Sequence, residues 1–272
     1  MFPLDEMKTE CYCSGSQDQH HHTILYSILS QKDSSYLNNN NNLNNYAMPH
    51  NCHCEQRKAV CLKNPDGACQ IASDVLVKTV RFMKSLPSFS QLPSEDQLAL
   101  LRDSWAPLFL LGLAQERMVF EVAELPDSSK LRRILLSGQG QSREEEDERR
   151  CLPTLAGVHK LRCCLDKLLD LGLSPKEYAY LKGTLLFNPD VQGLGVSSHI
   201  ESLQQEAQKA LQEVILNDQQ GKDRFRRILL VASTTQTVSQ NLLTELFFRP
   251  VIGQEDLFEL LNEMLFMRQE YS

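Results

Sequence analysis

The stretch of sequence that decides the fold is residues 82–101, FMKSLPSFSQLPSEDQLALL. Pro87 ends the helix that precedes it, because a proline clashes with the previous helical turn. Ser94 stands three residues before Gln97, a spacing that predicts a capping box at the start of a second helix. The stretch therefore predicts two helices joined by a proline-bounded corner.

Apolar residues on both sides of the corner predict which faces are buried. The first helix is built on Ile71, Val75, Phe82 and Leu86, and the second carries a stripe of Leu98, Leu101, Trp105, Leu108 and Leu111. Such helical spacing points one face inward, and Pro107 predicts a kink within the second helix. Phe89 and Leu92 are expected to hold the connection down on apolar surface.

The corner resembles the signature of the nuclear-receptor ligand-binding domain. The matching residues are Phe82, Lys84, Phe89, Leu92, Asp96-Gln97 and Leu100-Leu101, with Met83 as a departure from the usual small residue. Asn188-Pro189-Asp190 and the run 248–253, FRPVIG, resemble the same family, so the resemblance covers about residues 70–268. It implies an all-α fold for residues 70–272, a three-layer antiparallel helical sandwich.

Length, net charge and cysteine count narrow the kinds of protein and of partner that are compatible with this sequence. A length of 272 residues allows one full domain and a tail, and the net charge of -7 is a poor match for a polyanionic partner. No signal peptide or membrane-spanning run is evident, so no membrane association is expected. The nine cysteines, an odd number, are expected to be reduced thiols. Together with the resemblance, this predicts a protein of the nucleus that is also found in the cytoplasm.

Residues 1–69 are expected to be a flexible, disordered N-terminal tail. The run 38–45, interrupted only at Leu43, consists of asparagines and cannot bury a core. Two Cys-x-Cys pairs, 11/13 and 52/54, flank three histidines, but zinc sites mostly space paired ligands by two to four residues. We therefore predict no metal here. The two zinc modules of a receptor DNA-binding domain also have no match, which agrees with a subgroup of nuclear receptors that lacks this domain.

Two segments resemble the Leu-x-x-Leu-Leu box by which coregulators dock on nuclear receptors. Their apolar positions at i, i+3 and i+4 form one patch on a helix; they are Leu25, Ile28 and Leu29 in the tail, and Leu131, Ile134 and Leu135 in the domain. Chance is the alternative for the first box, and core packing is an equal alternative for the second. Residues 165–169, LDKLL, fit the box literally but are predicted to be core.

The resemblance also implies a coregulator groove. Lys84 and Glu263 would grip the two ends of a docking peptide, since a helix exposes N–H groups at its start and carbonyls at its end. The groove between them would be lined by Val80, Leu98, Leu101 and Met264. The alternative is an ordinary amphipathic terminal helix with Glu263 merely exposed.

No ligand, cofactor or catalytic residue is predicted. Many steroid-type receptors anchor a polar ligand group with an arginine, and the aligned residue here is Glu116, while Phe109 and Leu113 are expected to fill the space. Phosphate-binding glycine loops, His-Glu-x-x-His and Gly-x-Ser-x-Gly motifs are absent from the sequence. His159 and Cys163-Cys164 lack an orienting partner, so they read as surface and core residues.

The later helices are predicted from capping signals and periodicity. They are expected at 152–172, from the capping box of Ser174 and Glu177 to about 186, from 198 to about 216, from 222 to about 248, and over 255–267. Arg224, Arg226 and Arg227 open the fourth of these, either as a solvated face or as a contact for a homodimer.

The resemblance implies a transcriptional corepressor that binds other nuclear receptors through its boxes, recruits corepressor proteins and does not bind DNA. A ligand-sensing orphan receptor, a sibling of the same subgroup with long N-terminal repeats, and a plain helical scaffold are the alternatives. Residues 46–70 hold too few apolar positions for the long first helix of the family. We therefore expect that helix to be absent or short, amides 46–70 to exchange within seconds, and the uncovered surface to receive a corepressor helix.

Overall fold

The structure, a computed structural model, describes residues 58–126, 152–216 and 221–267, all of which belong to one unit, residues 51–272. Its central corner consists of α3 (Pro65–Ser85), the short α4 (Pro87–Ser90) and α5 (Ser94–Gln115). Leu86 adopts an extended conformation and Pro87 begins the next helical turn. Phe89 and Leu92 are buried, as predicted.

The predicted capping box at Ser94 is wrong. Ser94 is already the first residue of α5, and no side chain caps this helix at Pro93. The side-chain amide of Gln97 instead donates from Nε2 to the carbonyl oxygens of Leu92, at 2.8 Å, and Ser90, at 3.3 Å. Gln97 therefore braces the corner, because it satisfies carbonyls that the connection leaves without helical partners.

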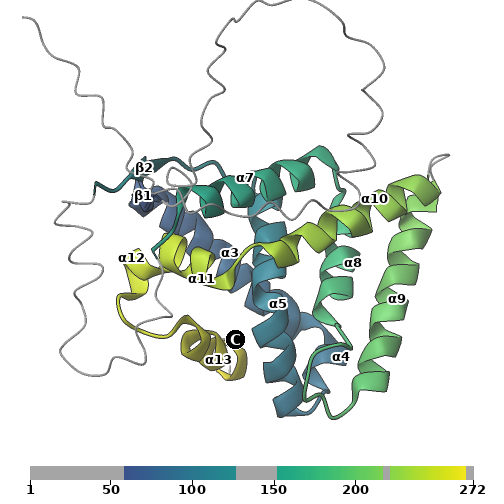
Figure 1. Cartoon of the computed structure of the whole chain (residues 1–272). Coiled ribbons are helices and arrows are strands. Elements are labelled where there is room, and N and C mark those ends of the chain that lie inside the picture. Colours follow the sequence, from purple (N-terminus) through teal and green to yellow (C-terminus); the bar gives the residue numbers. More distant parts are fainter. Residues whose placement is uncertain (1–57, 127–151, 217–220, 268–272) are drawn as a thin grey trace, which may run out of the picture. The chain divides into compact units, whose positions relative to one another are not determined.

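The helices form a three-layer antiparallel sandwich, which confirms the predicted all-α class (Figure 1). On one side lies α3, in the middle lie α5, α8 (Pro175–Leu186) and α9 (Ser197–Leu216), and on the other side lie α7 (Leu155–Asp170) and α10 (Gly221–Ser233). The capping box of Ser174 and Glu177 is present at the start of α8.

The middle helix α5 is buried almost all round over its second half, since residues 104–114 are all buried. It continues through Pro107 as one helix. A Cβ atom at Gly112 would lie 2.5 Å from Cγ1 of Val75 on α3. Only a glycine therefore permits these two helices to approach so closely.

The prediction of one long helix from 222 to 248 is wrong, because this segment consists of several shorter helical pieces. After α10 follow a 3₁₀ turn, η3 (Thr234–Thr237), then α11 (Gln240–Leu243), the π-helical η4 (Thr244–Phe248), α12 (Arg249–Ile252) and α13 (Leu257–Phe266). The hydroxyls of Thr234, Thr235 and Thr237 donate to carbonyls three residues earlier. Such bonds compete with the helical ladder, and Val238 is then extended.

Two short strands, β1 (Val60–Leu62) and β2 (Val122–Glu124), pair antiparallel with Val60 opposite Glu124. Strand β1 is not among the elements predicted from the sequence. Among residues 58–64 there is no helix, and α3 begins at Pro65. Residues 60–62 lie in a strand and residues 65–70 in a helix, which argues against rapid exchange of these amides; residues 46–57 lie outside the described part.

Two buried carboxylates tie distant elements together. Asp96 in the first turn of α5 accepts from the backbone N–H groups of Gly195, at 2.7 Å, and Val196, at 3.2 Å. Glu177 on α8 pairs with Arg224 on α10 at 2.9 Å. Burial favours a raised pKa for Glu177, but hydrogen bonds from Arg224 and Ser174 outweigh it, so that the pKa of this carboxyl lies below its usual value.

Candidate functional site

The end of α3 and the last turn of α13 meet at Lys84. Its Nζ donates to the carbonyl oxygen of Met264 at 3.0 Å and to that of Met267 at 2.8 Å. The last carbonyls of a helix have no partner within the helix and carry partial negative charge, so a lysine stabilises them. Lys84 therefore holds the C-terminal end of α13.

The apolar side of α13 lies against α3. The buried residues of this helix are Leu257, Leu261 and Leu265, spaced four residues apart on one face. Val80 and Leu101 are 2% and 0% exposed and belong to the same hydrophobic cluster as this face. The role of Val80 and Leu101 as a groove lining stays a prediction.

Two further predicted groove residues pack at the margin of this cluster. Leu98 on α5 and Met264 on α13 are partly buried and pack against the core. Glu263 is exposed on α13, the same helix whose carbonyls Lys84 binds. Lys84 and Glu263 therefore do not face each other across an empty groove here, and their joint grip on a peptide stays a prediction.

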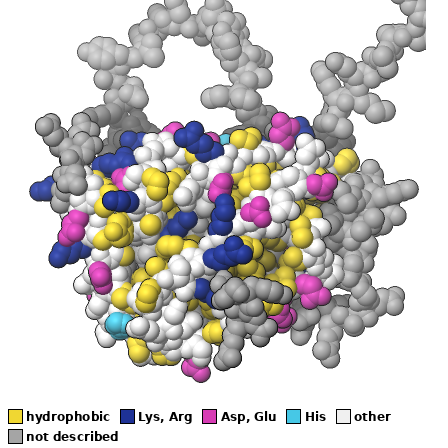
Figure 2. Space-filling model, turned by 180° about the vertical axis from the view of Figure 1, so that it is seen from behind, with side chains coloured by type: hydrophobic (Ala, Val, Ile, Leu, Met, Phe, Trp, Pro, Cys, Tyr) yellow, Lys and Arg dark blue, Asp and Glu magenta, His cyan; other side chains and the backbone are white. Residues whose placement is uncertain are grey.

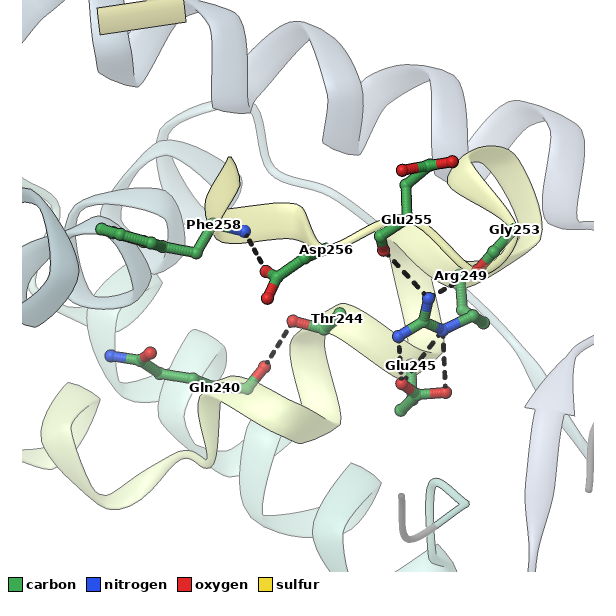
Figure 3. Close-up of polar contacts among 8 residues, drawn as sticks. All are labelled: Gln240, Thr244, Glu245, Arg249, Gly253, Glu255, Asp256 and Phe258. Atoms are coloured by element: carbon green, nitrogen blue, oxygen red, sulfur yellow. Dashed lines mark hydrogen bonds and ion pairs between the residues drawn. The ribbon is translucent and has the colours of Figure 1, made fainter. Parts of the chain in front are cut away.

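The start of α13 is held by a residue that sequence reasoning quoted only as part of a family motif, Arg249 (Figure 3). Its guanidinium forms a largely buried ion pair with Glu245, at 2.9 Å, and also donates to the carbonyl oxygens of Gly253 and Glu255. The spacing of Glu245 and Arg249, i and i+4 on a helix, is the signal that predicts such a pair. The ion pair positions the Arg249 guanidinium, and its hydrogen bonds to these two carbonyls hold the link between α12 and α13.

Local backbone features complete that link. Gly253 has a φ of 64°, in the region that favours glycine, and ends α12. The carboxylate of Asp256 accepts from the N–H of Phe258 at 2.7 Å and caps α13 (Figure 3). The guanidinium of Arg102 on α5 lies 4.0 Å from the centre of the Phe258 ring, a cation–π contact. The first turn of α13 is therefore docked on α5.

A cavity of about 360 Å³ opens beside this first turn. Its wall includes Arg102, Trp105, Gln240, Glu245, Arg249 and Leu261. Trp105 donates its indole N–H to Gln240 at 3.0 Å, and Gln240 donates to the carbonyl of Arg102. The cavity lies between α5, the α11–η4 segment and α13, so movement of α13 would change its shape.

Aromatic side chains fill the interior between α5 and η4. The ring centre of Phe109 lies 5.3 Å from that of Phe248 and 6.1 Å from that of Phe247. The ring centres of Phe120 and Phe247 are 5.3 Å apart. Glu116, at the position where many steroid-type receptors have an arginine, pairs with Lys78 at 2.6 Å. The space that the resemblance assigns to a ligand anchor thus holds an acidic residue bound to a lysine.

The histidine and cysteines on α7 take the places expected of surface and core residues. Sγ of Cys163 lies 3.5 Å from Nε2 of His159, which is exposed. Cys164 is buried, and burial raises the pKa of its thiol. A raised pKa disfavours the thiolate that a nucleophile needs. Over residues 58–126, 152–216 and 221–267, no three His, Cys, Asp or Glu side chains are grouped to hold a metal ion.

The two predicted docking boxes, 25–29 and 131–135, lie outside the described residues. Leu165 and Leu168, from the literal box on α7, are 4% and 0% exposed, so they are core as predicted, whereas Leu169 of the same box is 37% exposed and does not fit the prediction. In the part of the chain that the structure describes, none of the helices is long and apolar enough to cross a membrane.

Comparison with known proteins gives this site a family. The family described as the ligand-binding domain of nuclear hormone receptor matches residues 62–252. The chain belongs to the nuclear-receptor family, which is a family of receptors and not of enzymes. The predicted family is therefore confirmed.

The particular relatives belong to one subfamily. Nuclear receptor subfamily 0 group B member 2 of Rattus norvegicus is 48% identical over 262 residues, covering 95% of this chain and 97% of that protein. The Homo sapiens protein of that name is 47% identical over 265 residues, with the same coverage. Nuclear receptor subfamily 0 group B member 1 of Callithrix jacchus is 39% identical over 227 residues, covering 78% of this chain and 48% of that protein.

Proposed function

We propose that this protein is a transcriptional corepressor that binds other nuclear receptors through its leucine-rich boxes. One observation carries the proposal: the chain's own α3–α5 face holds a leucine-rich helix by its buried stripe and, through Lys84, by its C-terminal carbonyls. A partner receptor with the same signature stretch has a matching face. That face would bind the box of Leu25, Ile28 and Leu29 in the same way.

Occupation of the partner's groove would exclude coactivators, because two helices do not fit one groove. The second box, Leu131, Ile134 and Leu135, offers another docking segment. Corepressor proteins would be brought by this chain's own domain, on the surface left uncovered by a short or absent first helix. Figure 2 shows one face of the domain, where hydrophobic side chains gather in patches among Lys and Arg. Apolar patches of this kind are used for protein binding.

Family membership points to the nucleus as the compartment in which the protein acts. Presence in the cytoplasm is part of the proposal. Direct DNA binding is not part of it, because a net charge of -7 opposes association with a polyanion. A ligand-sensing receptor is the second candidate, favoured by the cavity beside the start of α13, whose shape a small molecule would influence.

The deciding experiment measures binding of the full chain to the purified ligand-binding domain of another nuclear receptor. Replacement of Leu25 and Leu29 together by Ala should weaken binding by roughly 2–4 kcal/mol, as expected for loss of two hot-spot leucines. Ser27→Ala is the matched control, because the i+2 position points away from the docking face. Its affinity should equal that of the unmodified chain.

The second box needs its own arm of the experiment. Leu131→Ala with Leu135→Ala should weaken binding further in the Leu25/Leu29 background, whereas Arg132→Ala with Arg133→Ala should change it little. Unchanged affinity with all four leucines replaced would remove the docking mechanism. Native mass spectrometry would then decide for the second candidate if a small molecule accompanies the protein in stoichiometric amount.

A further inference from the structure

A histidine and a cysteine on α7 form a pair with the geometry of two metal ligands. His159 and Cys163 stand at i and i+4, so they share one face of the helix, where His159 is exposed and Cys163 is partly exposed. Sγ of Cys163 lies 3.5 Å from Nε2 of His159. We propose that this pair binds a Zn²⁺ ion together with Cys52 and Cys54, two cysteines that precede the first strand.

The separation of the two atoms matches one edge of a zinc tetrahedron. Zinc–sulfur and zinc–nitrogen bonds of about 2.3 and 2.0–2.1 Å, held at tetrahedral angles, place sulfur and nitrogen about 3.5–3.6 Å apart. Two ligands at i and i+4 on a helix are also used by zinc proteins whose motif is His-Glu-x-x-His. A hydrogen bond between thiol and imidazole has a similar length, so the assignment depends as well on which other ligands reach the pair.

The backbone brings the segment before β1 to the start of α7. The carbonyl oxygen of Lys58 accepts from the N–H of Leu155 at 2.9 Å, and Ala59 pairs with Thr154, the N-cap of α7. The two ligands on α7 stand four and eight residues beyond Leu155. At the rise of an α-helix they are about 6 and 12 Å from it along the axis. The chain before Lys58 therefore leads from the end of α7 that carries the pair.

Cys52 and Cys54 stand within reach of this end of α7. They precede Lys58 by six and four residues, and four extended residues span up to about 14 Å. Both belong to the same compact unit as α7, residues 51–272. Alternate residues of an extended chain point to one side, so both thiols can face one metal ion.

The four side chains together make a ligand set that neither pair supplies alone. The sequence-based prediction of no metal considered the cysteine pairs of residues 1–69, and α7 adds two ligands to one of them. Three sulfurs and one nitrogen are a set that structural zinc sites use. With four protein ligands no position remains for a reacting water, so the site would join residues 52–54 to α7 and would not be catalytic.

Charged neighbours of Cys163 favour the thiolate that a metal ligand requires. Lys160 and Lys167 stand at i−3 and i+4 from this cysteine, where side chains on a helix are neighbours, and both are exposed. Asp166, at i+3, acts in the opposite direction. Two cations and one carboxylate therefore surround the thiol on its own helix.

The test is native mass spectrometry of the full chain, kept under reducing conditions and titrated with Zn²⁺ alone. The unmodified chain should bind one zinc ion. His159→Gln and Cys163→Ser should each weaken zinc affinity by more than about 100-fold, because even groups that only orient a ligand contribute 10–100-fold. Cys52→Ser with Cys54→Ser should weaken it as much. Thermal unfolding without zinc should be the same for all these variants.

The matched control removes the other Cys-x-Cys pair. Cys11→Ser with Cys13→Ser should leave zinc affinity unchanged, and so should Cys61→Ser on β1. Alkylation with N-ethylmaleimide, mapped by peptide mass spectrometry, gives a second readout. Zinc should protect the three proposed ligand thiols from the reagent and leave Cys61 as reactive as before.

Two results would overturn the inference, and neither bears on receptor binding. One is a chain that binds no zinc, or binds it equally tightly after His159 and Cys163 are replaced. The other is loss of zinc in the Cys11/Cys13 variant with retention in both α7 variants, which would place the ion within residues 1–57.

Discussion

At the scale of single residues, the buried ion pair of Glu177 and Arg224 shows how a side chain on α8 depends on α10. Arg224 also donates to the carbonyl of Leu171, so one guanidinium joins the end of α7, α8 and α10. Replacement of Arg224 by Ala leaves a buried carboxylate with fewer partners and should lower the free energy of unfolding by about 2–3 kcal/mol. Arg226→Ala, in an exposed pair 3.8 Å from Asp223, is the control and should show no measurable change in urea denaturation.

The same carboxyl makes stability depend on pH. The pKa of Glu177 in the folded state lies below its ordinary value of 4.5, so its stabilising contribution is present above pH 4.5 and is lost as the pH falls through the folded pKa. The difference in unfolding free energy between the unmodified chain and Glu177→Gln should therefore shrink between pH 6 and pH 3. A difference that stays constant over this range would show that Glu177 does not titrate in this way.

Single residues were also where the sequence was most informative about the site. The spacing from Lys84 to Asp96-Gln97 carries the family signature, and from this resemblance Lys84, Val80 and Leu101 were predicted as groove residues. That Lys84 binds α13 was not predictable, because the pattern names a contact with a helix end but not which helix supplies it. Arg249 was missed as the anchor because its carbonyl partners depend on the turn at Gly253.

At the scale of elements, the contact between α3 and α5 depends on one glycine. Gly112→Ala would place a Cβ 2.5 Å from Val75, so we expect a loss of about 1–3 kcal/mol although alanine favours helices. Gly67→Ala in the first turn of α3 meets no atom within 4 Å and should stabilise by about 0.5–1 kcal/mol. Thermal unfolding of both variants checks the pair, and a stable Gly112→Ala protein would contradict the close approach.

The presence of helices with a strong apolar periodicity was predicted from the sequence. Breaks caused by side chains that compete for backbone hydrogen bonds were not. The helices α3, α5, α7 and α8 were predicted from apolar stripes and proline or capping signals. The predicted buried faces were only partly right, since Ile71 of α3 is 40% exposed and residues 104–114 of α5 are all buried. The break after α10 arises from threonine hydroxyls that bind backbone carbonyls, and apolar periodicity does not report such bonds. The strand β1 has three residues and depends on its partner β2 across the chain.

At the scale of the whole molecule, charge predicts how the protein meets DNA. With a net charge of -7, a mobility-shift titration on receptor response elements should show no specific complex, even at low salt. The full chain should be titrated alone and then together with a DNA-binding receptor, which serves as the positive control. A band from the chain alone that persists as salt rises would contradict the expectation, because salt weakens phosphate contacts and not base contacts.

The order of synthesis gives the tie at Asp96 a further consequence. Its partners Gly195 and Val196 follow 99 and 100 residues later, and the partners of Lys84 follow 180 and 183 residues later. At about 5–20 residues per second, a ribosome makes the partners of Asp96 roughly 5–20 s after Asp96 itself. During that interval the nascent chain contains α3 and α5 but lacks the two backbone N–H groups that donate hydrogen bonds to this carboxylate. The middle layer is therefore completed only late in translation, and transcripts cut short before codon 195 should yield products that the cell's chaperones retain.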